Sequence, residues 1–312
     1  MSMATHTNVD EQEKMAMKVL IVGGTGLTGA TTARHLQQQG HEVTLMSRSR
    51  PSNPALADFP FIVANYIEED VSAEQLQGFD WLVFAAGADI RMLPDGGDPE
   101  AFFSRANTEG IPRFFARARA AGIRRAAYLG TYYPQVVPEK IEASPYLKSR
   151  YLADQAIRKM SAEDFVVCSI NAPFIIGVFP GVVDAHLAAL VRYVAGEIEG
   201  LPIVAPAGGV VHITARSLAE ALEGALLRGD SGKAYLVGDE YLSWKNYFEE
   251  FCRALGKPRS LEVSTDEHPM LPDIIMYAGR NAVVDYVPDN APLDYATGNV
   301  SAAIIDVVNA YS

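Results

Sequence analysis

The sequence predicts a doubly wound α/β fold, in which a parallel β-sheet carries helices on both faces. A short apolar run at 18–22 breaks into a loop with glycines at 23, 24, 26 and 29, and a helical pattern follows from Leu27 to about Gln39. Strand-like and helical segments then alternate through the first half of the chain, as is typical of parallel strands joined by crossover helices. Most strand-like segments are continuous apolar runs, which indicates burial on both faces of the sheet.

The individual elements follow from these patterns and from helix-capping residues. We expect strands at 18–22, 42–46, 61–64, 81–85, 126–129 and 165–170. Serine or aspartate before a helix accepts a hydrogen bond from a free amide of the first turn, and proline suits the first helical position. The residues in such positions are Ser72 with Gln75, Asp98 before Pro99, Ser144 before Pro145, and Ser243. Gly40 and Gly256 suit the ends of the first and last of these helices.

Three segments are expected along the chain. Residues 1–15 are polar, without the apolar core of a signal peptide, and we expect a disordered tail. Residues 16–171 would form the dinucleotide-binding domain. After about residue 172 the alternation loosens and loops rich in glycine and proline appear, so residues 172–312 would form a smaller, partly interleaved substrate-binding region.

The glycine-rich loop predicts a binding site for a dinucleotide pyrophosphate. Its phosphates must approach the backbone closely, and the following helix offers free N–H groups and a partial positive charge. The loop residues expected to hold the cofactor are Gly23, Thr25, Gly26, Leu27, Thr28 and Gly29. The alternative is a glycine-rich turn that binds nothing.

The end of the second expected strand predicts which cofactor binds. An acidic residue there would hold the ribose 2′-hydroxyl of NAD. This chain has Ser47 and Arg48 instead, which suit a 2′-phosphate through a hydroxyl and a planar guanidinium. NADP(H) is therefore favoured over NAD(H), unless Arg48 and Arg50 are ordinary solvated charges.

Composition excludes several other classes of protein. The net charge is −12, from 26 Lys and Arg against 38 Asp and Glu, which disfavours nucleic acid and an anionic membrane surface as partners. The two cysteines, Cys168 and Cys252, are far apart and suggest neither a disulfide framework nor a zinc site, so we expect no metal and a reducing, cytoplasmic location.

Further motifs follow the glycine loop in a fixed order. They are Ala85-Ala86-Gly87, Asn107-Thr108-Glu109-Gly110, Tyr128-Leu129-Gly130-Thr131, Tyr146 with Arg150, and Asn171-Ala172-Pro173. In this order the chain resembles the short-chain dehydrogenase/reductase superfamily, in particular its extended or atypical branch of epimerase/dehydratase-like proteins. The resemblance covers residues 17–260. It implies that Ala85, Ala86, Gly87, Asn107, Ala172 and Pro173 also contact the cofactor, and it makes a homodimer plausible.

The resemblance implies three catalytic residues, one of which differs from the residue that the family has at that position. Tyr146 would be the general acid/base and Thr131 the hydroxyl that binds the reacting oxygen, but Arg150 stands where the family has lysine. A phenol with pKa near 10 needs roughly 4 kcal/mol of phenolate stabilisation to titrate near neutrality, and a nearby cation is the main source. Lys148 is two residues from Tyr146 and would point elsewhere on a helix.

Three interpretations of this departure stay open. Arg150 performs the lysine's task, or Tyr132 or Tyr133 assists the proton transfer, or catalysis is lost. A second formal Tyr-x-x-x-Lys, at Tyr241 and Lys245, straddles a helix start and is expected to be a chance match.

The expected substrate site lies at the junction of the two regions. Its candidate residues are Tyr132, Tyr133, Phe174, Ile175 and His186, with plain core packing as the alternative. The leading function is an NADP(H)-dependent oxidoreductase acting on a ketone or secondary alcohol of a small, partly apolar substrate. An epimerase or dehydratase of a sugar-like substrate is one alternative, and Arg192 and Arg216 keep a nucleotide-sugar substrate open. A non-catalytic NADP(H)-binding regulator is the other.

Overall fold

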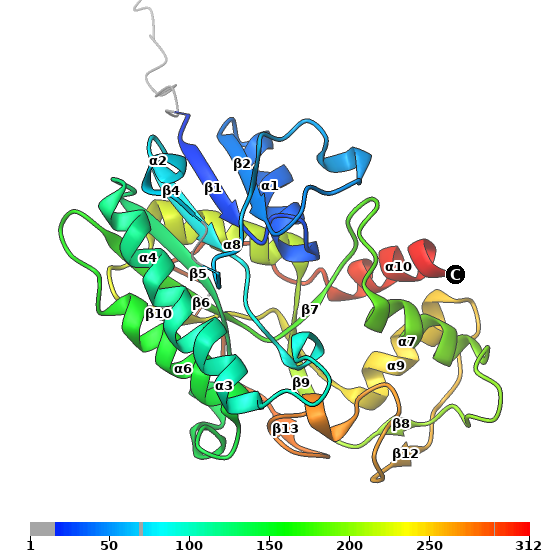
Figure 1. Ribbon diagram of the computed structural model, residues 1–312. Helices are drawn as coiled ribbons and strands as arrows, with labels where there is room; N and C mark the ends of the chain where they lie inside the picture. The colour runs from blue at the N-terminus through cyan, green and yellow to red at the C-terminus, as the bar shows by residue number, and fades with distance from the viewer. Residues whose placement is uncertain (1–15, 69–70, 290) are drawn as a thin grey trace, which may run out of the picture.

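A seven-stranded parallel sheet organises the molecule (Figure 1). The computed structural model describes residues 16–68, 71–289 and 291–312, so the expected tail at 1–15 lies outside the described residues. The strand order is β10-β6-β5-β4-β1-β2-β3. The strands are β1 (Lys18–Val22), β2 (Glu42–Ser47), β3 (Phe61–Val63), β4 (Trp81–Phe84), β5 (Arg125–Thr131), β6 (Val166–Ala172) and β10 (Ala234–Leu236). The doubly wound fold and the first six strands are confirmed.

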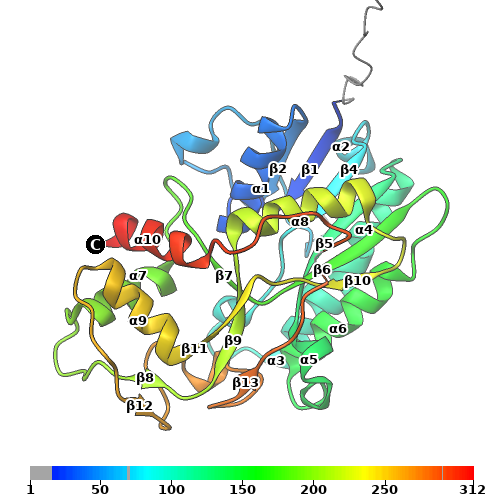
Figure 2. The same ribbon diagram turned by 180° about the vertical axis from the view of Figure 1, so that it is seen from behind.

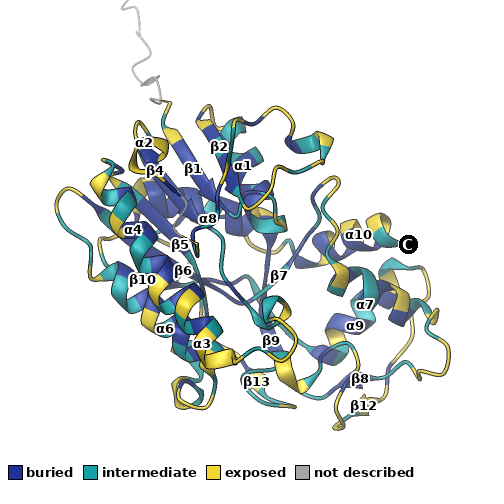
Figure 3. Ribbon diagram, in the orientation of Figure 1, coloured by how far each residue is buried: buried dark blue, intermediate teal, exposed yellow. Residues whose placement is uncertain are grey.

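Helices cover both faces of this sheet. On one face lie α1 (Leu27–Gln38) and α8 (Ala215–Arg228), seen in front of the sheet in Figure 2. The other face carries α2 (Ala73–Leu76), α3 (Pro99–Phe103), the π-helical turn η3 (Ser104–Glu109), α4 (Gly110–Ala120) and α6 (Pro145–Arg158). Successive residues of β1 pack on opposite layers: Ile21 joins the core under α1 and α8, and Leu20 joins the core under α4 and α6. Strands buried in this way appear dark blue in Figure 3, whereas the outer helix faces are yellow.

The predicted helix starts are formed by side-chain hydrogen bonds. Ser72 and Gln75 make a complete capping box, and Asp98 accepts from the amide of Glu100. Ser144 caps α6 through the amide of Leu147. Ser243 likewise caps α9 (Trp244–Ala254) through the amide of Asn246, and Gly256 follows this helix with φ of 69°.

A second, smaller layer lies beside the carboxyl ends of the main strands. Its sheets contain β7 (Phe174–Ile176), β9 (Gly209–Thr214), β11 (Glu240–Ser243) and β13 (Val283–Val284), and the short pair β8 (Ala205–Pro206) and β12 (Val263–Ser264). Helices α7 (Ala185–Ala195), α9 and α10 (Val300–Tyr311) pack against one another around it. Short helical turns complete the chain: η1 (Pro54–Leu56), η2 (Ile90–Met92), α5 (Tyr133–Val136), η4 (Pro138–Lys140) and η5 (Asp273–Ile275).

The chain passes between the two layers more than once. After β7 and α7 it returns to the large sheet through α8 and β10, and then leaves it again for α9 and α10. Residues 215–236, within the segment expected to form the smaller region, therefore pack on the main sheet. The strand β10 has only three residues, too few to show a strand pattern in the sequence. None of the helices in the described part of the chain is both long and apolar enough to cross a bilayer.

Candidate active site

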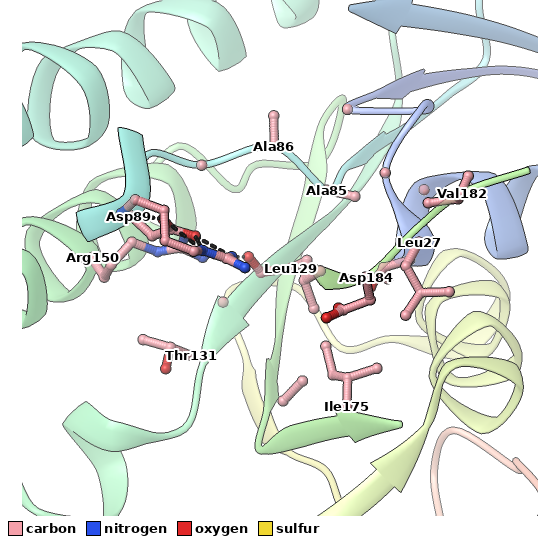
Figure 4. A pocket seen from close by; sticks show the side chains of 18 of the residues that line it. Leu27, Ala85, Ala86, Asp89, Leu129, Thr131, Arg150, Ile175, Val182 and Asp184 are labelled. Carbon is pink, nitrogen blue, oxygen red and sulfur yellow. Dashed lines mark hydrogen bonds and ion pairs between the residues drawn. The ribbon is translucent and has the colours of Figure 1, made fainter. Parts of the chain in front are cut away.

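Three neighbouring cavities lie where the parallel strands end. The central cavity, of about 490 Å³, lies beyond the ends of β1, β4, β5 and β6 (Figure 4). Of the residues predicted from sequence, its walls contain Gly23, Gly26, Leu27, Thr28, Gly29, Ala85, Ala86, Gly87, Thr131, Tyr146, Arg150, Ala172, Pro173 and Ile175. The carboxyl ends of parallel strands are where ligands bind in open α/β sheets. The cavity therefore lies where a dinucleotide is expected.

The glycine loop has the shape that a pyrophosphate requires. A Cβ on Gly29 would lie 2.2 Å from the carbonyl oxygen of Gly23, so the loop and helix α1 touch at backbone distance. A Cβ on Gly26 would meet no protein atom closer than 3.7 Å, which leaves open room above this residue. Gly26 is also the N-cap of α1 and offers no side chain to its free amides. Close loop packing, open room and uncapped amides together fit a phosphate group.

The second cavity, here called the β2-side cavity, has a volume of about 310 Å³. Thr25, Ser47 and Arg48 line it, together with Asn65 and Tyr66. Arg48 is exposed at the end of β2 and forms no ion pair with any described residue. The described residues that line this cavity include no carboxylate that would repel a 2′-phosphate. Burial raises the pKa of Tyr66 to about 12 and keeps its hydroxyl protonated.

Arg50 has a different environment from Arg48. Its guanidinium lies 5.4 Å from the centroid of the Phe61 ring, and it does not line the cavity. The two arginines therefore differ in position: of the two, Arg48 lines the cavity in which a cofactor ribose would lie, and Arg50 packs on Phe61.

Arg150 is buried in the floor of the central cavity, one helical turn after Tyr146. Its Nη2 donates to the carbonyl oxygen of Leu129 at 2.6 Å, and its guanidinium lies 5.3 Å from the centroid of the Tyr128 ring. Figure 4 shows the side chain extending toward Leu129. A Cβ on Gly87 would come within 2.2 Å of Nη1. The absence of a side chain at Gly87 therefore makes room for a guanidinium, which is broader than an ammonium.

Tyr146 and Thr131 meet at one end of the central cavity. Tyr146 is half-buried, and its ring stacks on Tyr277 with centroids 4.7 Å apart and contacts Phe103 edge to face at 5.6 Å. Thr131 ends β5 and lines the same space. Neither hydroxyl forms a hydrogen bond with a described residue, so both are free to meet a ligand.

Two other residues near the site have structural partners. Asn107 is fully buried behind the cavity wall, where it bonds both backbone groups of Ala88 and donates to the Ser149 hydroxyl at 3.1 Å. It joins the loop after β4 to helix α6 and does not line the central cavity. Lys148 pairs with Glu142 at 3.0 Å on the surface, away from the site.

The third cavity, of about 330 Å³, opens from the Tyr146 end of the central one and is called the aromatic cavity below. All five predicted substrate residues line it: Tyr132, Tyr133, Phe174, Ile175 and His186. The rings of Tyr132 and Tyr133 contact each other with centroids 4.2 Å apart and planes tilted by 35°. Burial raises the pKa of Tyr132 well above its ordinary value, so its hydroxyl is a poor proton donor or acceptor. Burial also lowers the pKa of His186 and keeps this side chain neutral at pH 7.

Sequence reasoning did not identify several residues of these cavities, among them three charged side chains and one aromatic side chain. Asp89 and Arg91 follow β4, Asp184 caps α7, and Tyr277 comes from the irregular segment after η5. Only Asp184 carried a readable signal, since aspartate before a helical pattern is an N-cap residue.

Other sequence features lie outside the site. Tyr241 is on β11, and Lys245 pairs with Glu249 at 3.7 Å on α9; neither residue lines any of the three cavities. Within the described part of the chain, no group of three histidine, cysteine or acidic residues is arranged to hold a metal ion. Cys168 and Cys252 are both buried and free.

The fold and the glycine loop are those of the dinucleotide-binding class of α/β proteins, and comparison with known proteins identifies the family. A model of the NAD dependent epimerase/dehydratase family matches residues 19–238. The chain belongs to this family, which confirms the resemblance in the sequence. The family is one of enzymes that bind a nicotinamide dinucleotide.

Two curated relatives match parts of the chain. A protein of Synechocystis sp. provisionally named dihydroflavonol 4-reductase is 29% identical over 178 residues, covering 51% of this chain and 50% of the relative. A 3-beta-hydroxysteroid dehydrogenase of Mycolicibacterium neoaurum is 26% identical over 200 residues, covering 56% and 54%. The chain thus spans about half the length of the curated relatives it matches.

Solved structures share the whole fold at low sequence identity. The Bordetella bronchiseptica enzyme WbmH in complex with NAD⁺ has a TM-score of 0.71 at 15% identity, covering 95% of this chain and 98% of that one. Two further similar structures, with TM-scores of 0.68 and 0.71, are complexes with UDP-glucose and NAD or with UDP-N-acetylmuramic acid. These likenesses establish the fold.

Proposed function

We propose that the protein is an NADP(H)-dependent oxidoreductase that interconverts a ketone and a secondary alcohol, with Tyr146 as general acid/base. The observation that supports this most is the grouping of Tyr146, Arg150 and Thr131 at one end of the central cavity, where the aromatic cavity opens. The reductase and dehydrogenase named among the relatives agree with this reaction class.

Each of these side chains has a distinct task in the proposed reaction. The reduced nicotinamide, when bound, supplies the hydride that reduces the carbonyl carbon. The Thr131 hydroxyl donates a hydrogen bond to the carbonyl oxygen, and Tyr146 gives that oxygen its proton. Arg150 is permanently charged and stabilises the phenolate left behind, which makes the proton transfer easier. Its bond to the Leu129 carbonyl holds this charge in place.

Replacement of Tyr146 tests this assignment directly. NADPH consumption is measured against a panel of ketones for the wild type and for Tyr146→Phe, which keeps the stacked ring but removes the acid. We expect kcat to fall by about 100-fold or more, the usual contribution of general acid catalysis. Tyr241→Phe is the matched control, since it alters the other formal Tyr-x-x-x-Lys and should leave turnover unchanged. Equal rates for wild type and Tyr146→Phe would contradict the role.

The preference for NADP(H) is part of the proposal and depends on Arg48. Its guanidinium lines the β2-side cavity and has no carboxylate partner among the residues that the structure describes, so it can pair with a 2′-phosphate. Arg48→Asp should reverse the preference, with a loss of NADPH affinity of about tenfold or more. Calorimetric titration with both cofactors measures this, and Arg50→Asp serves as the matched control. Tighter binding of NADH by the wild type would refute the preference.

A non-catalytic NADP(H)-binding regulator is the second candidate function. The observation that favours it is the commitment of the Arg150 Nη2 to the Leu129 carbonyl, which withdraws one donor from the site. This candidate predicts tight NADPH binding without turnover of any ketone in the panel. An epimerase or dehydratase would need a second acid or base beside Thr131, and the buried Tyr132 is poorly suited to that task.

A further inference from the structure

The aromatic cavity offers flat apolar walls on several sides. Tyr146 and Tyr277 form one stacked wall, and the Tyr132–Tyr133 pair forms another, with Tyr133 and Tyr277 in edge-to-face contact at 5.4 Å. Phe174 comes from β7, in the smaller layer. Aromatic side chains prefer offset or edge-to-face contact with another ring, and each such contact adds to the free energy of burial. Walls of this kind favour a planar aromatic ligand.

The charges around this cavity do not suit an anion. Its lining contains one arginine, Arg91, whose Nε lies 3.1 Å from both carboxylate oxygens of Asp89. His186 is neutral at pH 7, because burial lowers its pKa. The arginine is therefore already paired, and the described residues that line this cavity include no other cationic side chain.

Asp184 makes the net charge of the lining negative, because Asp89 and Asp184 stand against the single arginine Arg91. Its Oδ1 accepts from the amides of His186 and Leu187 at 3.0 Å, and its Oδ2 has no hydrogen-bond partner among the described residues. Figure 4 shows this side chain extending between Leu27 and Ile175, and it lines both the central and the aromatic cavity. A negative group brought into the aromatic cavity would be repelled by this carboxylate, since like charges interact strongly where water is excluded.

The two arginines that the sequence offered as contacts for a nucleotide-sugar substrate lie outside the aromatic cavity. Arg192 is on the surface near Glu197, with 3.8 Å between their charged atoms, and the exposed Arg216 is on α8. Neither lines the aromatic cavity. A diphosphate is bound by cationic side chains or by free amides at the start of a helix. The described lining residues of this cavity include no free cation, and Asp184 caps the start of α7.

We infer that the substrate is an aromatic ketone, or the corresponding alcohol, that bears no phosphate or carboxylate, and that Asp184 determines this selectivity. This inference rests on the proposed function. The ring would pack against the tyrosine walls while its carbonyl reaches Thr131 and Tyr146. Reduction converts the carbonyl and NADPH, with one proton from Tyr146, into the alcohol and NADP⁺.

Three ketones of similar size and different charge test the inference. They are 4-methylacetophenone, which is neutral, 4-(aminomethyl)acetophenone, which is cationic, and 4-acetylbenzoate, which is anionic. Their binding to the NADP⁺-loaded protein, which has no hydride to give to a ketone, is measured by calorimetry, with UDP-glucose as a fourth probe. We expect the anion to bind about tenfold more weakly than the neutral ketone, the cation to bind at least as well as it, and UDP-glucose not to bind.

The variant Asp184→Asn tests whether the charge of Asp184 causes the weaker binding of the anionic ketone. The amide keeps the size and the hydrogen bonds of the cap but removes the charge, so the difference between anion and neutral ketone should shrink to about threefold or less. Glu139→Gln, which removes one charge from the exposed turn η4, should leave the difference unchanged. The affinity of each variant for NADP⁺ is measured first, because Asp184 also lines the central cavity.

The outcomes separate this inference from the proposed function. Charge-ordered binding without turnover would remove the oxidoreductase assignment, and the ketone would then be a ligand whose selection by charge still depends on Asp184. Turnover with equal affinity for all three ketones, tight binding of UDP-glucose, or an unchanged difference in Asp184→Asn would each overturn the inference and leave the reaction class intact.

Discussion

The cofactor end and the substrate end of the site are formed by different kinds of residues. The cofactor end consists of backbone and small side chains from segments that directly follow β1, β4 and β5, among them Gly23, Gly26 and Ala85. The substrate end consists of large aromatic side chains from distant parts of the chain, such as Tyr132, Phe174 and Tyr277.

This contrast has a physical origin in what each end must recognise. A pyrophosphate presents the same charge and shape in every cofactor, so a fixed loop geometry with free amides suffices. A substrate is recognised by the shape and polarity of a whole cavity, which many different side chains can form. The first end is therefore sensitive to single added atoms, whereas the second depends on packing among several rings.

The largest effects are expected where the loop tolerates no added atom. Gly29→Ala places a Cβ 2.2 Å from the Gly23 carbonyl oxygen, and backbone must move to relieve it. We expect a loss of about 3 kcal/mol in the free energy of unfolding, together with loss of NADPH binding. Gly26→Ala meets no such contact, so stability should change by less than about 0.5 kcal/mol while NADPH affinity falls at least tenfold. Thermal unfolding and calorimetry measure both.

A result in which both variants bind NADPH like the wild type would contradict the view that the loop geometry creates the cofactor end. Loss of stability in Gly26→Ala would show that the room above this residue is needed for folding rather than for a ligand.

The next largest effect concerns a buried histidine in the smaller layer. His212, on β9, is 0% exposed, and its ring stacks on Tyr247 with centroids 4.6 Å apart. Burial lowers its pKa to about 3, whereas an unfolded histidine titrates near 6.5. Between these values the unfolded chain binds a proton that the folded protein does not, so stability is complete above pH 6.5 and falls as the pH decreases. From pH 6.5 to pH 5 the loss from this group is about 2 kcal/mol.

Replacement of this histidine isolates its share of the acid sensitivity. In His212→Phe, which keeps a stacked ring, the loss of stability between pH 6.5 and pH 5 should be smaller than in the wild type by about 2 kcal/mol. Denaturant unfolding at several pH values measures it. Parallel curves for the two proteins would show that other groups cause the acid sensitivity.

The contrast between the two ends also explains which features could be predicted from the sequence. The first six strands, the helix caps at Ser72, Asp98, Ser144 and Ser243, and the family follow from local patterns, and the structure and comparisons bear them out. Caps and buried parallel strands are visible in sequence because neighbouring residues create them.

What sequence reasoning missed depends on contacts between distant segments. Strand β10 has three residues and exists because it pairs with β6. Tyr277 belongs to an irregular segment whose position is set by tertiary packing, and no local pattern relates it to Tyr146, from which it is separated by more than a hundred residues. Such residues are identified only when the folded chain brings them together.

The smallest expected effect tests whether ring packing at the substrate end matters for catalysis. Tyr277 stacks on Tyr146 but lines neither the central nor the β2-side cavity. Tyr277→Ala removes a ring contact of about 1 kcal/mol, so kcat should fall by about fivefold, while the affinity for NADPH stays unchanged. Tyr277→Phe keeps the ring and should restore kcat, because stacking rather than the hydroxyl holds Tyr146. If the Phe variant is as slow as the Ala variant, the Tyr277 hydroxyl contacts the substrate itself, and the packing account of this end is wrong. Steady-state kinetics with saturating NADPH, combined with a cofactor titration, distinguishes the two cases.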